Sequence, residues 1–199
     1  MRKLLIATRN KGKFLEIKKA LEGLPFEFLS LDDIKKIPKD FEVKEIGKSF
    51  TENAVLKAKT IGGMSSLLTL ADDSGLEVEI LGGRPGVFSS RYAKGTDEDR
   101  YQKLLGELKE VPWEKRNAQF RCLTAIFDPK TKKLETCEGI CRGKITQQPK
   151  GKHGFGYDPV FYLPELGRTM AQLKLVQKNK ISHRGKALKK ARKILRKFL

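Results

Sequence analysis

Short apolar segments alternate with amphipathic ones along the first half of the chain. Residues 3–8 form a short apolar run and predict a buried strand. Phe14, Ile17 and Leu21 then recur at helical spacing, and they predict a helix over residues 11–21 with Asn10 before its first turn. A second strand is expected over residues 26–31. Strand, short polar turn and helix is the local pattern of an α/β protein.

A second helix is predicted after the irregular, charged stretch of residues 31–48. Ser49 and Glu52 have the spacing of a capping box, with Ser49 as the N-cap. The residues that follow place Phe50, Ala54, Ala58 and Ile61 on one face. Lys57 lies at the border of that face, where its stem can cover the core while the ammonium group stays available to an anion.

The second half of the chain predicts a further set of elements. We expect an apolar strand over residues 66–71, a separate strand over 76–80 and an amphipathic helix over 97–110. Residues 118–127 and 134–145 flank Asp128-Pro129-Lys130 and predict a long antiparallel hairpin. Residues 147–157 are rich in Gly, Lys and Pro and predict a loop. A regular apolar stripe from Ala187 to Phe198 predicts a docked terminal helix.

Charge changes the picture, because it is concentrated near the end of the chain. The 199 residues carry a formal net charge of +18, and residues 168–199 contain twelve Lys or Arg and no Asp or Glu. A basic surface implies an anionic partner, either nucleic acid or a small polyphosphate. No apolar run approaches the roughly 20 residues of a membrane-spanning helix, and the first residues lack the pattern of a signal peptide. We therefore expect a cytoplasmic protein without a membrane partner.

Cysteine and histidine usage argues against a structural zinc site. The chain contains three cysteines, Cys122, Cys137 and Cys141, with no CxxC pair, and only two histidines. All three cysteines are interpreted as buried small hydrophobic residues.

Asp72-Asp73 is the first candidate for chemistry. The pair follows the predicted strand at 66–71, and ligands of open α/β sheets bind beyond the carboxyl ends of strands. Two carboxylates there could bind a hard cation and deprotonate a water molecule. Asp-Ser-Gly is equally good turn chemistry. The pair by itself leaves both interpretations open.

Three further clusters favour the chemical interpretation. Thr8-Arg9-Asn10 with Lys13 could bind an anion at a helix N-terminus, or be a solvated basic helix start. The loop Gly154-Phe155-Gly156-Tyr157-Asp158-Pro159 could stack on a base, or be a tight turn packed by its own aromatic rings. Ser182-His183-Arg184-Gly185 begins the last helix and could contribute to the site, or be an N-cap Ser with solvated neighbours. No P-loop, dinucleotide fingerprint or nucleophile elbow is present.

Together these residues resemble one family, the noncanonical purine NTP pyrophosphatases, also called inosine or xanthosine triphosphate pyrophosphatases. Five segments carry the resemblance in order: IATRNKGKFLEI at 6–17, SFTENAVLKAK at 49–59, LADDSGLEVEILGGRPGVFSSRYA at 70–93, FGYDPVF at 155–161 and KNKISHRGKAL at 178–188. It implies an elongated α/β fold of two lobes around a long mixed β-sheet with a central active-site groove, formed by residues 1–199 as a single domain. It also implies a homodimer.

The same resemblance implies an activity and a role for each matching residue. Members hydrolyse ITP, dITP and XTP to the monophosphate and pyrophosphate with Mg²⁺, which cleanses the nucleotide pool. Asp73 would be the proton acceptor and a Mg²⁺ ligand, Asp72 its helper, and Glu45 a second Mg²⁺ ligand. Substrate would be bound by Thr8, Arg9, Asn10, Lys11, Gly12, Lys13, Lys57, Ser74, Phe155, Gly156, Tyr157, Asp158, Lys178, His183 and Arg184.

One residue departs from the family pattern, and two other functions stay open. Bacterial members usually have Gly where this chain has Arg9, and the larger side chain is expected to be tolerated if it points outward. The basic terminal helix would also suit a nucleic-acid-binding protein or a Mg²⁺ nuclease, although we do not expect nucleic-acid binding to be the main function. Within enzymes, the alternative is a related pyrophosphatase that prefers modified pyrimidine or ordinary nucleotides.

Overall fold

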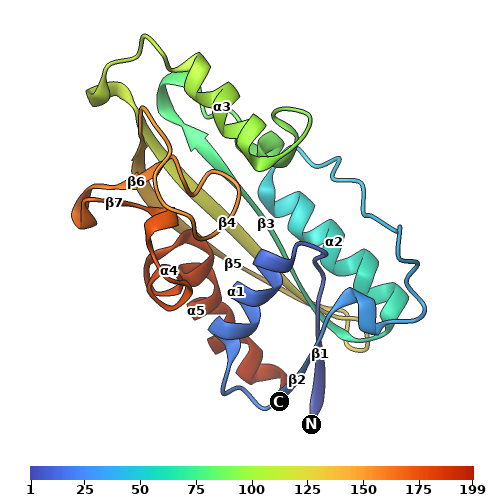
Figure 1. Ribbon diagram of the computed structural model, residues 1–199. Coiled ribbons are helices and arrows are strands. Elements are labelled where there is room, and N and C mark those ends of the chain that lie inside the picture. Colours follow the sequence, from blue (N-terminus) through green and yellow to red (C-terminus); the bar gives the residue numbers. More distant parts are fainter. The chain divides into compact units, whose positions relative to one another are not determined.

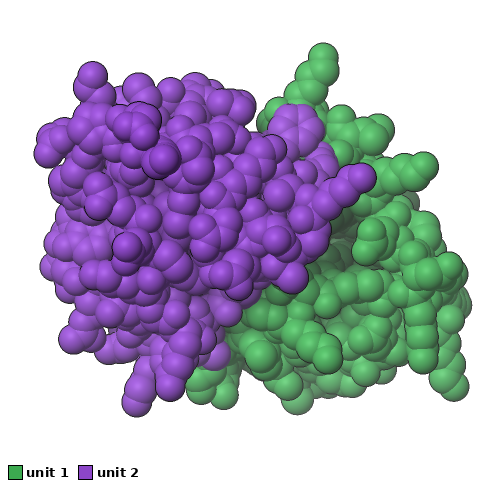
Figure 2. All heavy atoms as spheres, turned by 45° about the horizontal axis from the view of Figure 1, so that its top comes forward, with its two compact units in different colours: residues 1–73, 122–139, 184–199 green, residues 74–121, 140–183 purple.

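The computed structural model describes residues 1–199, and they divide into two compact units (Figure 2). Unit 1 comprises residues 1–73, 122–139 and 184–199, and unit 2 comprises residues 74–121 and 140–183. The helices are α1 (Lys11–Leu21), α2 (Phe50–Ser65), α3 (Asp97–Glu107), α4 (Leu175–Ile181) and α5 (His183–Leu195). The strands are β1 (Arg2–Ile6), β2 (Phe26–Leu29), β3 (Leu68–Val78), β4 (Asn117–Asp128), β5 (Lys133–Ile145), β6 (Phe161–Leu163) and β7 (Arg168–Thr169).

The seven strands form one open mixed sheet in the order β2-β1-β3-β4-β5-β6-β7 (Figure 1). β1 pairs in parallel with β2 and β3, whereas β6 pairs antiparallel with β5 and β7. β4 and β5 are neighbours joined by the four residues 129–132, a connection short enough for a hairpin. The expectation of an α/β fold around a mixed sheet is confirmed.

Unit 1 has helices on both faces of its part of the sheet (Figure 1). On one face, α1 and α5 bury apolar side chains against β1–β4 in a common core, which includes Ile6, Ile17, Leu70, Ile126 and Leu188. On the other face, α2 approaches closely through Gly62. A Cβ atom there would come within 2.9 Å of Phe127 and 3.3 Å of Thr69 Oγ1. Both faces of β3 are therefore covered, which explains its nearly continuous apolar start.

Both chain ends belong to unit 1. The Arg2 guanidinium donates to the carbonyl oxygen of Phe198 and, at 2.8 Å, to a carboxylate oxygen of Asp128. The apolar stripe predicted for the end of the chain is buried at Ala187, Leu188, Ala191, Leu195 and Phe198. The prediction of a docked basic helix is thus confirmed by α5, which is continued by a short 3-10 turn over Arg196–Phe198.

Unit 2 has a core of its own. Leu76 and Val78 from β3 pack with Leu104 and Leu108 from the α3 region and with Phe161 from β6. Arg116 is buried at the edge of this core. Its guanidinium donates to the carbonyl oxygens of Leu108, Val111 and Thr146, so no counter-charge is needed there to satisfy its N–H groups.

Two predicted boundaries are wrong. The strands expected over 66–71 and 76–80 are one strand, β3, which runs through Asp72 and Asp73 without a break. The Asp-Ser-Gly sequence favours a turn locally, but pairing of β3 with its neighbours overrides that preference. The helix expected over 97–110 ends at Glu107, because residues 108–110 form a tighter turn. None of the helices is long and apolar enough to span a bilayer.

Candidate active site

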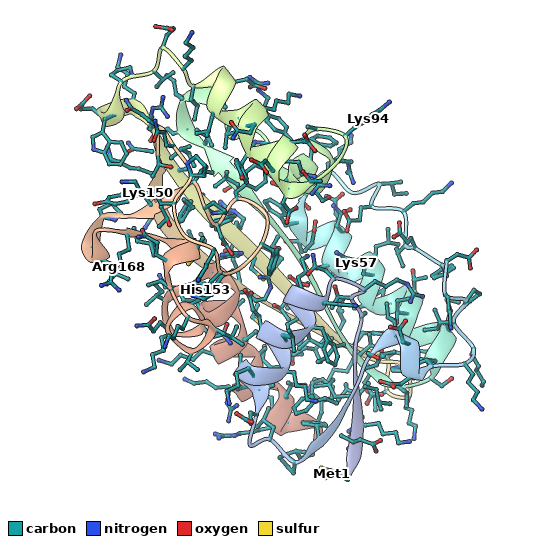
Figure 3. All side chains as sticks on the ribbon, viewed as in Figure 1. Met1, Lys57, Lys94, Lys150, His153 and Arg168 are labelled. Atoms are coloured by element: carbon teal, nitrogen blue, oxygen red, sulfur yellow. The ribbon has the colours of Figure 1, made fainter.

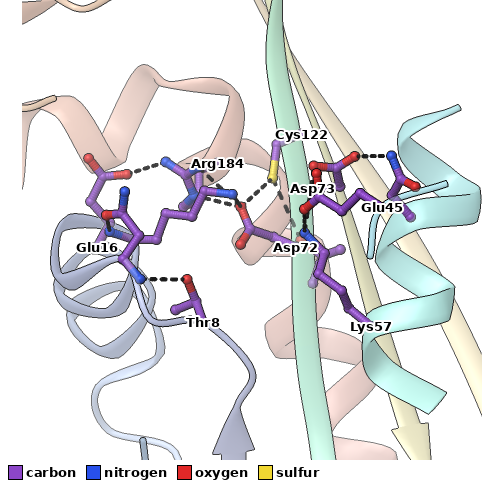
Figure 4. A network of polar contacts seen from close by, with 12 residues as sticks. Thr8, Glu16, Glu45, Lys57, Asp72, Asp73, Cys122 and Arg184 are labelled. Atoms are coloured by element: carbon purple, nitrogen blue, oxygen red, sulfur yellow. Dashed lines mark hydrogen bonds and ion pairs between the residues drawn. The ribbon is translucent and has the colours of Figure 1, made fainter. Parts of the chain in front are cut away.

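Asp72 and Asp73 point to opposite faces of β3 (Figure 4). Successive side chains alternate along a strand, so Asp72 shares the face of Leu68 and Leu70, towards α1 and α5. Asp73 shares the face of Thr69, towards α2. Both carboxylates are buried, with 2 % and 5 % exposure. Continuity of β3 therefore separates the pair into two chemical environments.

Asp73 lies in a cluster with Asn53, Lys57 and Glu45, called here the Asp73 cluster. Asn53 Nδ2 donates to Asp73 Oδ2 at 3.0 Å, and Lys57 Nζ lies 3.6 Å from Asp73 Oδ1. Lys57 Nζ also donates to Glu45 Oε1 at 2.9 Å. Asn53 and Lys57 are four residues apart, one turn of α2, so both reach the same strand position.

The Ser49 N-cap predicted for the start of α2 is confirmed, whereas the reciprocal bond of the predicted capping box is displaced by one residue. Ser49 Oγ accepts from the Glu52 N–H at 3.2 Å. The Glu52 carboxylate reaches back to the N–H of Lys48, at 2.9 Å, rather than to that of Ser49. Asn53 Oδ1 accepts from the Gly47 N–H at 2.8 Å. These bonds attach the segment that carries Glu45 to the helix that carries Lys57.

Electrostatics in the Asp73 cluster favour a proton acceptor. Burial raises the pKa of Asp73, with a further contribution from the Glu45 carboxylate, and together they outweigh the opposing effect of Lys57. Burial alone would lower the pKa of Lys57, but the surrounding carboxylates outweigh it and raise that pKa. Lys57 is therefore a fixed positive charge, while the raised pKa of Asp73 makes this carboxylate a better proton acceptor than an ordinary aspartate.

Asp72 lies in a second group with Arg184, Glu16 and Lys13, called here the Arg184 cluster. Arg184 contacts Asp72 Oδ2 through Nε and NH2, each at 3.1 Å, and its NH1 donates to Glu16 Oε2 at 2.5 Å. Lys13 Nζ lies 3.4 Å from the same oxygen of Asp72. Three elements, α1, β3 and α5, meet in this one ion network.

The Arg184 cluster holds Asp72 as a permanent anion. Burial alone would raise the pKa of Asp72, but the cations of Lys13 and Arg184 outweigh burial and hold that pKa well below its ordinary range. A carboxylate with a strongly lowered pKa is a poor proton acceptor. The geometry therefore suits Asp72 to orienting Lys13 and Arg184.

Cys122 on β4 borders the same carboxylate, with Sγ 3.9 Å from Asp72 Oδ2. Burial, reinforced by the Asp72 charge, raises the pKa of this thiol to about 12. The group therefore remains a neutral thiol, and a neutral thiol is a poor nucleophile. Cys122 and Cys141 are buried, as the sequence predicted, whereas Cys137 is only partly buried, and none of the three forms a disulfide.

The turn between β1 and α1 has the predicted form of a capped helix start. Asn10 Oδ1 accepts from the Lys13 N–H at 2.9 Å, and Thr8 Oγ1 accepts from the Asn10 N–H at 3.2 Å. Lys11 and Gly12 form the first turn of α1. Backbone N–H groups at such a terminus favour an anion, and Lys13 adds a full charge on the same turn.

Arg9 fastens this turn to the irregular segment at 31–48. Its guanidinium donates to Asp32 Oδ1 at 2.9 Å and to the carbonyl oxygen of Pro38 at 2.7 Å. A longer contact of 3.4 Å reaches the carbonyl oxygen of Phe41. The side chain therefore contacts the segment that leads to Glu45.

Unit 2 contains the other predicted group, the loop at residues 154–158, called here the Phe155 loop. Asp158 accepts from the Phe155 N–H at 2.9 Å and from Lys178 Nζ. The Lys178 ammonium lies 4.7 Å from the centroid of the Phe155 ring. The ring is half-buried, so one part of it remains accessible, whereas Asp158 and Lys178 are buried. The preceding residues Lys150 and His153 are exposed (Figure 3).

The remaining predicted residues of unit 2 have structural partners. Tyr157 is buried and its hydroxyl donates to the Ser89 carbonyl oxygen at 2.9 Å. The His183 ring stacks on Phe120, with centroids 4.6 Å apart and planes 17° from parallel. Ser74 follows Asp73 directly on β3 and is half-buried.

Two buried side chains belong to these clusters although sequence reasoning gave them no role. Glu16 is paired with Arg184, and Asn53 donates to Asp73. Glu16 precedes the apolar position Ile17 and lies one helical turn from Lys13. These two sequence features indicate only weakly that Glu16 is buried. Asn53 was visible only as a polar residue beside the apolar face of α2. Their partners lie too far away in sequence for spacing to reveal them.

The Asp73 cluster has the donor chemistry that a hard divalent cation requires. No group of three or more His, Cys, Asp or Glu side chains in the structure could by itself hold a metal ion. Mg²⁺, however, is usually held by one or two protein carboxylates together with substrate phosphates and water. Asp73 and Glu45 share one lysine, and their charges are close enough to influence each other. The residues therefore fit such an ion.

Comparison with known proteins gives a consistent match over nearly the whole chain. The model of the Ham1 family matches residues 4–194. A protein of Geobacter sulfurreducens named dITP/XTP pyrophosphatase is 50% identical over 190 residues, which cover 94% of each chain. A protein of Bacillus subtilis with the same name is 43% identical over 197 residues, covering 98% of each.

Solved structures agree with the sequence matches. A HAM1 protein from Coxiella burnetii superposes with a TM-score of 0.88 at 38% identity, covering 99% of this chain and 100% of the other. The Ham1 protein of Staphylococcus aureus superposes with a TM-score of 0.86 at 36% identity, covering 100% of both chains.

Proposed function

This chain belongs to the Ham1 family, and from that premise we propose that it hydrolyses dITP, ITP, XTP and dXTP to the monophosphate and pyrophosphate. The enzyme class, a nucleoside triphosphate pyrophosphatase, rests on relatives named dITP/XTP pyrophosphatase at 43–50% identity. The observation that carries the chemistry is the Asp73 cluster, in which a carboxylate of raised pKa lies beside a fixed cation and a second carboxylate.

Asp73 is the proposed proton acceptor. It takes a proton from the water molecule that attacks the α-phosphorus, and the bond to the pyrophosphate leaving group breaks. Asn53 holds one oxygen of Asp73 through its amide N–H, which orients the other oxygen. Asp73 and Glu45 would hold Mg²⁺, which when bound supplies a Lewis acid that offsets charge on the reacting phosphate.

The cations of unit 1 are the proposed triphosphate ligands. Thr8 to Lys13 offer a helix N-terminus and an ammonium group, and Lys57 offers a second ammonium group held in its charged form by neighbouring carboxylates. Asp72 is proposed to act through Lys13 and Arg184, whose charged groups it orients. Fixed cations of this kind stabilise negative charge on the leaving group without reorganisation.

The Phe155 loop of unit 2 is the proposed base-binding element. The Phe155 ring stacks on the purine, and Asp158 and Lys178 hold the loop and the base edge. Inosine and xanthosine carry an acceptor oxygen at purine position 6, whereas adenine carries an amine donor. A set of donors would leave adenine unpaired, at about 1–3 kcal/mol for each buried unsatisfied group.

The resemblance to the family supports two broader proposals. The chain acts as a single domain that forms a homodimer, which sedimentation velocity can test, and it works in the cytoplasm, where the nucleotide pool is. Neither proposal is needed for the chemistry above.

One panel of substrates tests the proposed activity. Pyrophosphate release is measured from ITP, XTP, GTP, ATP and dUTP, with Mg²⁺ and with EDTA. We expect turnover of ITP and XTP with Mg²⁺, and little from ATP or dUTP or without a divalent ion. Guanine shares the 6-oxygen of inosine, so the GTP rate reports whether the site also excludes the 2-amino group. Equal rates on ATP and ITP would remove the specificity claim, and a preference for dUTP would favour the pyrimidine alternative.

The nucleic-acid alternative has a separate signature. Binding to duplex DNA or RNA through the basic α5 would weaken steeply with salt, since each neutralised phosphate releases counterions. Tight duplex binding at physiological salt, together with absent ITP hydrolysis, would favour this function over the one proposed.

A further inference from the structure

Asp97 ties the N-terminus of α3 to the Phe155 loop, within unit 2. Its Oδ2 atom accepts from the Gly156 N–H at 2.7 Å, although the two residues are 59 positions apart in the chain. Its Oδ1 atom accepts from Arg100 NH1 at 2.5 Å, and Arg100 in turn donates to the Gly95 carbonyl oxygen at 2.9 Å. Both carboxylate oxygens are therefore engaged, one with its own helix and one with the loop.

The backbone conformation of the Phe155 loop is held by hydrogen bonds from side chains. Gly154 and Gly156 have φ values of +78° and +64°, in the left-handed region that favours glycine. The loop lies outside the helices and strands, so their hydrogen bonds do not hold it in this conformation. Inside the loop, Asp158 accepts from the Phe155 N–H and from Lys178. The side of the loop at Gly156 is held from outside, by Asp97.

The hydrogen bond to Asp97 also determines whether the Gly156 N–H can donate to a bound base. A backbone N–H donates one good hydrogen bond, and this one already faces a carboxylate. Gly156 is therefore engaged in holding the peptide plane next to Phe155, rather than offering a donor to a bound base. A hydrogen bond to an ionised acceptor is among the stronger kinds in proteins.

From these contacts we propose that Asp97 is a positioning residue for nucleobase binding: it fixes Gly156, and through it the ring of Phe155, in the orientation that stacks on the purine. The inference rests on the proposed function of the Phe155 loop. Without Asp97 the loop remains closed at Asp158 but samples several ring orientations, so the base binds with an added ordering cost. Ligands without a base are unaffected.

Ligands with and without a base separate this role from a general loss of structure. Affinities of the Mg²⁺-loaded enzyme for IMP and for pyrophosphate are measured by titration calorimetry in the unmodified protein and in Asp97→Ala. We expect affinity for IMP to fall about ten-fold, as for one charge-assisted hydrogen bond, with affinity for pyrophosphate unchanged. Asp97→Asn, which retains an acceptor oxygen, should restore part of the difference.

Glu98→Ala is the matched control. Glu98 is the next residue, also acidic and also in the first turn of α3, and it is exposed. Its removal changes the charge at the helix N-terminus equally, and both affinities should stay as in the unmodified enzyme. Melting temperatures of all variants report folding separately.

The outcomes distinguish this proposal from the proposed function. Unchanged IMP affinity in Asp97→Ala, or an equal fall in both affinities, would overturn the positioning role. Absence of pyrophosphate release from ITP and XTP by the unmodified enzyme would instead overturn the proposed function, which the calorimetric comparison does not use.

Discussion

The two faces of β3 use the same residue type for different purposes. Asp72 lies in the Arg184 cluster, where two cations lower its pKa far below the ordinary range, and Asp73 lies in the Asp73 cluster, where burial raises it. The two carboxylates are adjacent in sequence and similarly buried. What differs is the helix that each one faces. The number and geometry of the facing cations, rather than burial, decides which aspartate can accept a proton.

The comparison also separates stability from activity. A group whose folded pKa is lowered stabilises the fold at any pH above its ordinary pKa, and this contribution is lost as pH falls through the folded value. A carboxyl group whose folded pKa is raised makes the opposite contribution: it lowers the free energy of unfolding above its ordinary pKa, because the fold disfavours its charged form. At neutral pH, Asp72 therefore stabilises the protein, whereas the charge of Asp73 weakens it, as is typical of a group that the proposed function uses as a base.

The largest expected effect is that of Asp73→Asn on turnover. Loss of the proton acceptor should reduce pyrophosphate release from ITP by roughly 10²–10⁴-fold, the usual contribution of general base catalysis. The same substitution removes a disfavoured charge, so the melting temperature at pH 7 should be unchanged or higher. Retained turnover would remove Asp73 as the base, and a marked loss of stability would contradict the assignment of the two faces.

Asp72→Asn should give the opposite pattern. Removing one partner of a buried ion network typically costs about 3–5 kcal/mol, which denaturant unfolding at pH 7 can measure. Asp73→Asn is the matched control, since it is the same substitution one residue away. If both variants unfold at the same denaturant concentration, Asp72 and Asp73 contribute equally to stability, and the contrast between the two faces of β3 is wrong.

Asn53→Ala should move the pH dependence of the reaction. The Asn53 amide lowers the pKa of Asp73, so its removal raises that pKa. The base must be deprotonated to act, and activity falls as pH drops through its pKa. The acid limb of the kcat/KM profile should therefore shift to higher pH, by about one unit for a hydrogen bond to a charged group. Thr60→Ala, elsewhere on α2, should leave the profile in place, and a shift to lower pH would contradict the role of Asn53.

The smallest effect is expected for Arg9→Ala. Its guanidinium holds the segment at 31–48 that leads to Glu45, so its loss should loosen that segment. Hydrogen exchange in residues 31–48 should become faster, and the Mg²⁺ concentration for half-maximal activity should rise a few-fold, from about 1 kcal/mol of lost ordering. Lys35→Ala removes an exposed cation of the same segment and should change neither quantity.

Local patterns in the sequence were sufficient for most of the elements. The Asn10 cap and the helix at 11–21, the Ser49 cap with its apolar face on α2, and the apolar stripe of α5 are all present as predicted. The two caps rest on contacts within a few residues, such as the bond from the Lys13 N–H to Asn10, and the apolar faces show as helical spacing in the sequence. Such contacts follow from spacing and side-chain chemistry, which a sequence contains completely.

Tertiary structure decided the rest of the site. A turn at Asp72-Asp73 was one of the two interpretations that the sequence left open, yet sheet pairing keeps β3 extended, and that one change sends the two carboxylates to opposite faces. Arg184 then reaches Glu16, which is 168 residues away, and Gly156 reaches Asp97. The sequence by itself determined which residues are available for chemistry. Only the folded chain decided which of them meet, because pKa values and orientation depend on partners that sequence spacing does not reveal.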